Sequence, residues 1–117
     1  MHTSGGLPSV IQAVGEILRK AVVQGGCAAA RYGGEEFAIL LPSTSLDHST
    51  AVAEDVRLRT RAMKIRDRRT QAVLLTVTLS GGVAALQPGD DAAALVQRAD
   101  AALYRSKQTG RDRVTRA

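Results

Sequence analysis

A chain of 117 residues with 44% hydrophobic residues is long enough for one domain with a packed core. Its net charge of +5 permits an anionic partner, but Tyr32, Phe37 and Tyr104 are its only aromatic residues, which argues against nucleic-acid binding by base stacking. The single cysteine excludes an intramolecular disulfide, and the lack of a bilayer-length apolar run or a signal peptide predicts a cytoplasmic domain without membrane insertion.

The first predicted helix follows a lead-in that has no hydrophobic periodicity. Ser9 is expected to cap this helix, and Gln12, three residues on, would complete a capping box. An apolar stripe at helical spacing runs from Val10 to Val22. The helix is expected to end near Gln24, because two glycines follow it.

A β-hairpin is predicted next, because two apolar runs, 27–30 and 37–42, flank the segment Arg31-Tyr32-Gly33-Gly34-Glu35-Glu36. Two adjacent acids are more than a tight turn requires. They fit a solvated tip without function, and they also fit a tip that holds a divalent cation beside a phosphorylated ligand. Composition and spacing alone leave both interpretations open.

A second helix is predicted from about residue 48 to 65, and the chain from 57 to 69 is strongly basic. This basic stretch is either a solvated surface or a patch for phosphate or a partner. Residues 72–78 are the best strand, and the glycines at 81 and 82 interrupt it before 83–86, which indicates a bulge or a close backbone approach. A third helix, capped by Asp90 or Asp91, should end near residue 109, and 111–114 should form a short closing strand.

This order of elements predicts an α/β fold, an α+β sandwich in which helices cover a sheet. The sheet is short of strands, because three clear strands would have to cover three amphipathic helices.

The predicted hairpin and last helix together resemble the GGDEF family of bacterial diguanylate cyclases. The hairpin block, 30–42, is similar to the family's signature hairpin in its Glu-Glu variant, and 99–114 is similar to the family's closing A-D-x-A-L-Y-x-A-K-x-x-G-R-N-R-V. Between them, 79–84 resembles the family's S-I-G-V-A strand, with Gly81 in place of Ile. The resemblance runs from about Ser9 to Val114 and implies a nucleotidyl-cyclase-like sheet flanked by helices.

The resemblance also implies a reaction. Two domains face each other, each holding one GTP, and the 3′-hydroxyl of one nucleotide attacks the α-phosphate of the other to give cyclic di-GMP and pyrophosphate. Such nucleotidyl transfer depends on positioning and on charge stabilisation by cations. The expected cofactor is Mg²⁺ (or Mn²⁺), and the expected partners are GTP, cyclic di-GMP and a second copy of the chain.

By the same resemblance, individual residues receive roles. Glu36 would be a metal ligand, and Glu35 would lie near the metals as a second ligand and help to activate the 3′-hydroxyl. Lys107 and Arg111, one helical turn apart, would contact phosphates, although on spacing alone they also fit charges that complement a helix dipole. The substrate-binding residues implied are Gly33, Gly34, Lys107 and Arg111.

The chain departs from the family pattern at its front end. It is expected to form a single domain, 1–117, that lacks the family's first central strand with its metal-binding Asp and the first helix with the guanine-reading residues. His2-Thr3-Ser4-Gly5 fits a remnant of the family's H-x-x-G. The missing strand would leave a gap in the sheet, and its exposed edges would favour dimerisation or segment exchange. Gln24 and Cys27 stand where the family's inhibitory R-x-x-D has Arg and Asp, so cyclic di-GMP is expected to bind elsewhere.

Three functions stay open from the sequence. The intact parent protein is an active diguanylate cyclase and this chain alone has little or no turnover, or the domain is a non-catalytic receptor for GTP or cyclic di-GMP. The third is a regulatory dimerisation module without a ligand.

Overall fold

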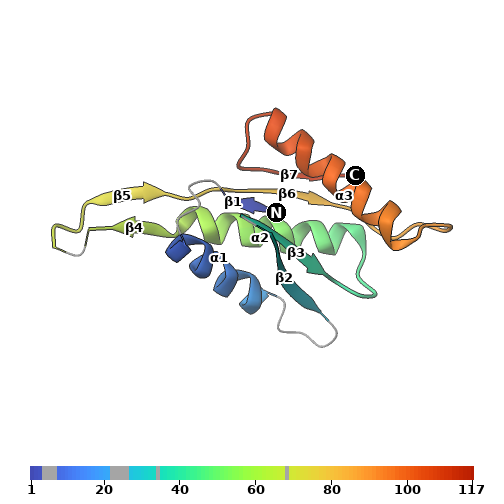
Figure 1. The fold of residues 1–117 in the computed structure, drawn as a ribbon, viewed down its shortest axis with the longest axis horizontal. Coiled ribbons are helices and arrows are strands. Elements are labelled where there is room, and N and C mark those ends of the chain that lie inside the picture. The colour runs from blue at the N-terminus through green and yellow to red at the C-terminus, as the bar shows by residue number, and fades with distance from the viewer. Residues whose placement is uncertain (4–7, 22–26, 34, 68) are drawn as a thin grey trace.

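A computed structural model describes residues 1–3, 8–21, 27–33, 35–67 and 69–117 of the chain. Two β-sheets and three helices make up the fold (Figure 1). Within the described residues, no helix is both long and apolar enough to cross a membrane. The elements in chain order are β1 (His2–Thr3), α1 (Pro8–Ala21), β2 (Ala28–Gly33), β3 (Glu36–Leu40), α2 (Leu46–Ala62), β4 (Lys64–Arg66), β5 (Val73–Thr76), β6 (Leu79–Val83), α3 (Ala92–Gln108) and β7 (Val114–Arg116).

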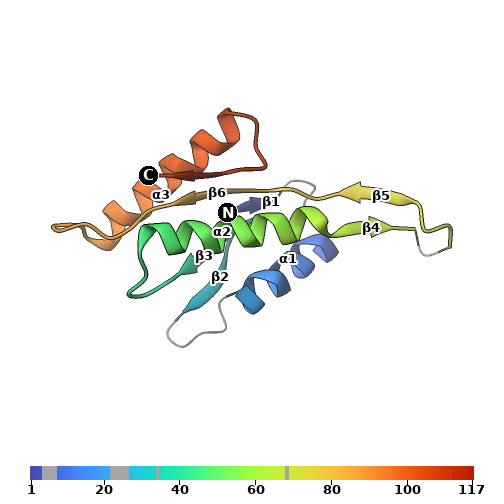
Figure 2. The ribbon, with the colours of Figure 1, turned by 180° about the vertical axis from the view of Figure 1, so that it is seen from behind.

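The main sheet has the strand order β2-β3-β1-β6-β7. Only β6 and β7 run parallel, and the other neighbours are antiparallel. Seen from both sides (Figures 1 and 2), α3 lies on one side of β6, and α1 and α2 lie on the other. This arrangement confirms the predicted α/β sandwich of helices on a sheet.

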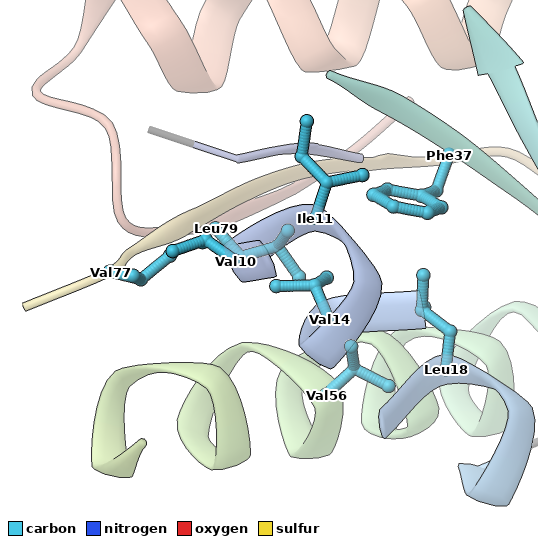
Figure 3. Packing of buried hydrophobic residues seen from close by; sticks show 8 residues of the cluster. All are labelled: Val10, Ile11, Val14, Leu18, Phe37, Val56, Val77 and Leu79. Atoms are coloured by element: carbon cyan, nitrogen blue, oxygen red, sulfur yellow. The ribbon is translucent and has the colours of Figure 1, made fainter. Parts of the chain in front are cut away.

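The core lies between α1, α2 and the sheet (Figure 3). The predicted apolar stripe of α1 supplies four of its residues, and Phe37 is the one aromatic among them. The core is therefore aliphatic, as the composition predicts. Its buried members are Val10, Ile11, Val14, Leu18, Phe37, Val56, Val77 and Leu79.

Helix boundaries were predicted with mixed success. Ser9 is not an N-cap, because α1 begins at Pro8, a residue suited to a first helical position where no N–H is needed. The predicted end near Gln24 lies outside the described residues. In α3, Asp91 is the cap, and its side chain accepts a hydrogen bond from the Ala94 amide at 2.8 Å. Asp90, the other candidate, accepts a hydrogen bond from the Gln87 amide at 2.8 Å instead.

The helix predicted to reach residue 65 ends at Ala62, and the next residues form β4. This strand pairs with β5 in a separate two-stranded sheet that extends along the long axis of the molecule (Figure 1). The single interrupted strand expected over 72–86 is likewise two strands, because β5 pairs with β4 whereas β6 joins the main sheet. Both errors arise because β4 and β5 pair with each other in an antiparallel hairpin, and local propensity does not report strand pairing.

The glycines of β6 lie inside the strand and do not break it. A β-carbon at Gly82 would stand 2.3 Å from the Ala99 carbonyl oxygen and 2.3 Å from the Leu103 nitrogen. Gly82 therefore allows α3 to pack directly on β6, which confirms the predicted close approach of two backbones.

The sequence predicts a strand-wide gap in the sheet, but the structure places β1 at that position. His2 pairs with both Glu36 of β3 and Ser80 of β6. β1 has two residues, whereas each of its neighbours has five. An open cavity of about 920 Å³ continues beyond Met1 between β3, β6 and α3, so the position is filled only in part.

Candidate functional site

The predicted hairpin is confirmed, with β2 and β3 antiparallel and in the register Arg31↔Phe37. The register shifts between Arg31 and Gly33, so the strand is irregular where it enters the turn. Glu35 lies in the turn and Glu36 opens β3, while Gly34 lies outside the described residues. The two carboxylates therefore leave the sheet at one tip.

The N-terminal residues hold this tip against the sheet. The Met1 amine donates to the Phe37 carbonyl at 2.7 Å, and the Phe37 amide donates to the Met1 carbonyl at 2.9 Å. The Thr3 amide and hydroxyl both donate to the Glu35 carbonyl, at 3.2 and 3.3 Å. These hydrogen bonds fix the backbone on both sides of Glu36 and therefore fix the position of the Glu35–Glu36 pair.

Each carboxylate of the tip meets a basic side chain. Lys107, in the last turn of α3, places Nζ 3.6 Å from Glu36 Oε1. His2 places Nε2 3.3 Å from Glu35 Oε2. The structure thus brings together Glu35, Glu36 and Lys107, three of the residues that the resemblance implies for the site.

The sequence places His2 only in a motif remnant and does not predict its contact with Glu35. Burial lowers the pKa of His2, the charges of Lys107 and Arg111 lower it further, and Glu35 and Glu36 act in the opposite direction. Among the described residues, none gives the buried His2 Nδ1 a hydrogen bond. The lowered pKa favours the neutral form of the His2 imidazole beside Glu35.

Two further groups at the site were missed from the sequence, the Met1 amine and Asp100. Burial lowers the pKa of the amine, and the charges that act on it come from Glu36, Lys107 and Asp100. Asp100 precedes Lys107 by seven residues, or two turns, and so lies on the same side of α3. That helical spacing is the signal that would have found Asp100.

Arg111 follows α3 in a turn formed by residues 110–113, which we call the 110–113 turn. Its amide donates to the Ser106 carbonyl at 2.9 Å, and its side chain is exposed. The charge of Arg111 contributes to the lowered pKa of His2, which lies beside Glu35. The site therefore has acids on the hairpin and bases on the end of α3.

The basic stretch after residue 57 is not uniform. Arg59 is a solvated helix residue, with a side chain 56% exposed and paired to Asp55 at 3.0 Å. Arg57 is only 12% exposed and contacts the 110–113 turn through Asp112. The interpretation as a solvated surface holds for Arg59 and is wrong for Arg57.

The donor set limits how a metal ion could be held. Over the described part of the chain, no three His, Cys, Asp or Glu side chains form a group that could bind a metal ion. Glu35 and Glu36 alone fit Mg²⁺ if nucleotide phosphates and water supply the other oxygens, which is the usual arrangement for that ion. The large cavity beyond Met1 is apolar, unlike the charged hairpin tip, because residues such as Leu86, Leu95 and Leu103 line most of it.

Fold and site together define an α/β domain in which an acidic hairpin tip meets the basic end of the last helix. The model of the family "Diguanylate cyclase, GGDEF domain" matches residues 8–113. The chain therefore belongs to the GGDEF family, as the two sequence blocks predict.

Curated relatives support the same assignment. The chain is 38% identical over 105 residues to diguanylate cyclase VdcA of Vibrio cholerae, a match that covers 90% of this chain and 31% of that protein. It is 38% identical over 115 residues to diguanylate cyclase A of Treponema denticola, covering 97% of this chain and 29% of the relative. The chain thus spans less than a third of the length of these relatives.

Solved structures show the same fold. The coiled coil and GGDEF domain of DgcB from Caulobacter crescentus, in complex with c-di-GMP, aligns with a TM-score of 0.86 and 35% identity, covering 93% of this chain and 56% of that one. The active GGEEF domain of a diguanylate cyclase from Vibrio cholerae aligns with a TM-score of 0.82 and 28% identity, covering 92% and 66%. The diguanylate cyclase SiaD of Pseudomonas aeruginosa, solved with its activator SiaC, aligns with a TM-score of 0.81 and 34% identity, covering 93% and 40%.

Proposed function

We propose that this domain supplies half of a diguanylate cyclase active site. In the intact parent protein, two such domains would each hold one GTP, and their condensation would give cyclic di-GMP and pyrophosphate. A homodimer follows from this chemistry, since each domain holds only one of the two reacting nucleotides. The use of GTP also agrees with the predicted cytoplasmic location.

One observation carries the proposal, the ion pair between Glu36 and Lys107 at 3.6 Å. It joins the hairpin block to the closing helix block across the fold. When nucleotide binds, the Lys107 ammonium group can leave Glu36 and bind a phosphate, and the Glu36 carboxylate can bind the cation that accompanies the phosphate.

The residues around the pair would divide the chemistry between them. Glu35 and Glu36 would hold Mg²⁺ or Mn²⁺ together with nucleotide phosphate oxygens, and the bound cation would stabilise negative charge on the phosphates. Lys107 and Arg111 would bind phosphate oxygens from the opposite side. Glu35 would accept the proton of the attacking 3′-hydroxyl, and Gly33 and Gly34 would leave room for the nucleotide.

We expect little or no turnover from this chain alone. His2 and Lys107 occupy Glu35 and Glu36, and the described residues add no third carboxylate within reach of both. The test is incubation with GTP and Mg²⁺, followed by chromatography and mass spectrometry for cyclic di-GMP. Strong turnover that Glu35→Ala abolishes would show that this expectation is wrong and that the chain is a complete enzyme.

Binding of GTP tests the half-site itself. Calorimetry with GTP and Mg²⁺ should show binding that Lys107→Ala weakens about tenfold or more, because a charge-assisted contact to phosphate is lost. Arg105→Ala is the matched control, since Arg105 lies in the same helix turn and instead contacts the Arg116 carbonyl at 3.3 Å. Equal affinities for GTP in the unchanged chain and Lys107→Ala would reject the proposed site.

The pairing of both carboxylates with protein bases favours one second candidate, a non-catalytic receptor for GTP or cyclic di-GMP. Calorimetry with cyclic di-GMP distinguishes it, since a receptor should bind this dinucleotide without making it. Gln24→Ala should leave such binding unchanged, because Gln24 and Cys27 do not reproduce the inhibitory motif.

A further inference from the structure

The 110–113 turn has an unusual backbone. Three consecutive residues have positive φ: Gly110 at 124°, Arg111 at 61° and Asp112 at 45°. Glycine adopts such values freely, but Arg and Asp do so at a cost and keep them only where the surroundings enforce them. Something must therefore hold Arg111 and Asp112 in this conformation.

The side chain of Arg57, from the middle of α2, is the main contact. Its Nη1 donates to Asp112 Oδ1 at 2.9 Å and to the Asp112 carbonyl at 3.3 Å. Its Nε donates to Glu54 Oε2 at 2.9 Å, and its Nη2 contacts Glu54 Oε1. The planar guanidinium group of Arg57 thus binds the Glu54 carboxylate on its own helix. It also binds both the side-chain carboxylate and the backbone carbonyl of Asp112 in the turn.

Electrostatics reinforce this contact. Hydrogen bonds to Glu54 and Asp112 raise the pKa of Arg57, and the hydrogen bond from Arg57 is the main cause of the lowered pKa of Glu54. Arg61 adds a longer contact, Nη1 to Asp112 Oδ2 at 3.6 Å. The Arg57 side chain is 12% exposed and that of Asp112 is 26% exposed, so water screens their contact less than it screens a pair of fully exposed charges.

The rest of the turn is fixed to β6. The Asp112 amide donates to Ser80 Oγ at 3.2 Å, and the Gly81 amide donates to the Arg113 carbonyl at 2.9 Å. The buried Ser106 hydroxyl donates to the Gly81 carbonyl at 2.7 Å. Ser80 and Gly81 of β6 thus hold the turn from the sheet side, while Arg57 holds Asp112 from α2.

We propose that Arg57 is a positioning residue for the phosphate site, which acts through Asp112 to fix the backbone of Arg111. Arg57 itself lies away from the hairpin acids and touches no group at the tip in the described structure. The direction in which Arg111 leaves the turn depends on its φ and on that of Asp112. The inference rests on the proposed function, since it assigns Arg57 to the site formed by Lys107 and Arg111.

Arg57→Lys is the decisive variant, because lysine keeps the positive charge but lacks the planar guanidinium group that binds two carboxylates and a carbonyl at once. It should weaken GTP binding about threefold to tenfold in calorimetry with Mg²⁺. In a chain that already carries Arg111→Ala, Arg57→Lys should cause no further loss of affinity, because its effect passes through Arg111. Equal losses with and without Arg111 would overturn the proposal and indicate a general structural role.

Hydrogen exchange gives a readout that does not need nucleotide. Arg57→Lys should speed exchange of the Arg111 and Asp112 amides about tenfold or more, while core amides of α1 stay protected. Arg59→Lys is the control, since Arg59 is in the same helix but its side chain pairs with Asp55 on that helix. Unchanged exchange at both amides would overturn the proposal.

The two measurements also separate this inference from the proposed function. If the unchanged chain does not bind GTP, the proposed function is wrong, and exchange alone decides whether Arg57 holds the turn. If the chain binds GTP and Arg57→Lys binds it equally well, the half-site stands and the role given to Arg57 is rejected.

Discussion

The site is held by two segments from opposite ends of the chain, β1 and the 110–113 turn. Both are hydrogen-bonded to β6, and β1 also pairs with β3 of the hairpin, but the ionisable groups of the two segments are in opposite situations. In β1, burial lowers the pKa of the Met1 amine and of His2, so their charged forms are disfavoured. At the turn, Arg57 of α2 donates a hydrogen bond to Asp112, and its hydrogen bonds to Glu54 and Asp112 raise its pKa, so the charged form is favoured.

The backbones show the reverse pattern. β1 is regular strand paired on both sides, whereas the turn has two non-glycine residues at positive φ. The turn therefore depends on its polar contacts, and β1 depends on the protonation state of its own groups. We therefore expect the turn to be more sensitive than β1 to substitutions, and β1 to be more sensitive than the turn to pH.

The largest effect should come from Gly82, on which both segments depend because β6 pairs with β1 and with β7. Gly82→Ala should destabilise the fold by about 3 kcal/mol or more, since the new β-carbon meets rigid backbone atoms at 2.3 Å. Urea unfolding followed by circular dichroism measures this loss.

Gly81→Ala is the matched control for that experiment. Its β-carbon would approach the Met1 and Val114 side chains at 3.4 Å, and side chains can move. A loss of stability at Gly81 equal to that at Gly82 would contradict the close packing of α3 on β6.

The next effect should come from the turn. Asp112→Ala removes the acceptor for Arg57 and Arg61 and should cost about 2 kcal/mol, because a mostly buried guanidinium loses a charged partner. Asp112→Asn should cost less, since its amide oxygen can still accept from Arg57. Equal unfolding free energies for the unchanged chain and Asp112→Ala would show that the contact does not hold the turn.

Local patterns in the sequence were sufficient for much of this structure. The apolar stripe of α1, the hairpin from Ala28 to Leu40 and the cap at Asp91 each depend on residues close in the chain. The two family blocks predict that Glu36 and Lys107 lie near each other. The structure brings their side chains into contact, although the residues are far apart in sequence.

What the sequence did not predict depends on tertiary contacts. β4 pairs with β5, and β1 pairs with both β3 and β6, but β4 and β1 have weak strand patterns of their own. Arg57 looks like any other arginine in a basic helix, and only the fold brings it to Asp112. His2 likewise becomes a site residue only when β1 pairs with the hairpin.

The smallest effect should be a dependence of stability on pH that comes from β1. Both the Met1 amine and His2 have folded-state pKa values below their ordinary values of 8.0 and 6.5. As pH falls, the unfolded chain therefore takes up these protons before the folded chain does. Stability should be full above about pH 8 and should decrease from there through pH 6.5 to the lowered values in the folded state.

Two modified chains assign this dependence to its groups. Acetylation of the Met1 amine removes its titration but keeps an N–H that can donate to the Phe37 carbonyl, so the loss that begins near pH 8 should disappear. His2→Gln should remove the loss of stability that begins near pH 6.5, because glutamine does not titrate. The glutamine amide can still contact Glu35, so only the dependence of that contact on charge is lost. Thermal unfolding between pH 9 and 5.5 measures both, and stays above the range in which the lowered pKa of Glu54 matters. A profile that is flat, or that rises toward pH 6, would mean that the buried end of β1 is not a source of pH sensitivity, and the contrast with the turn would fail.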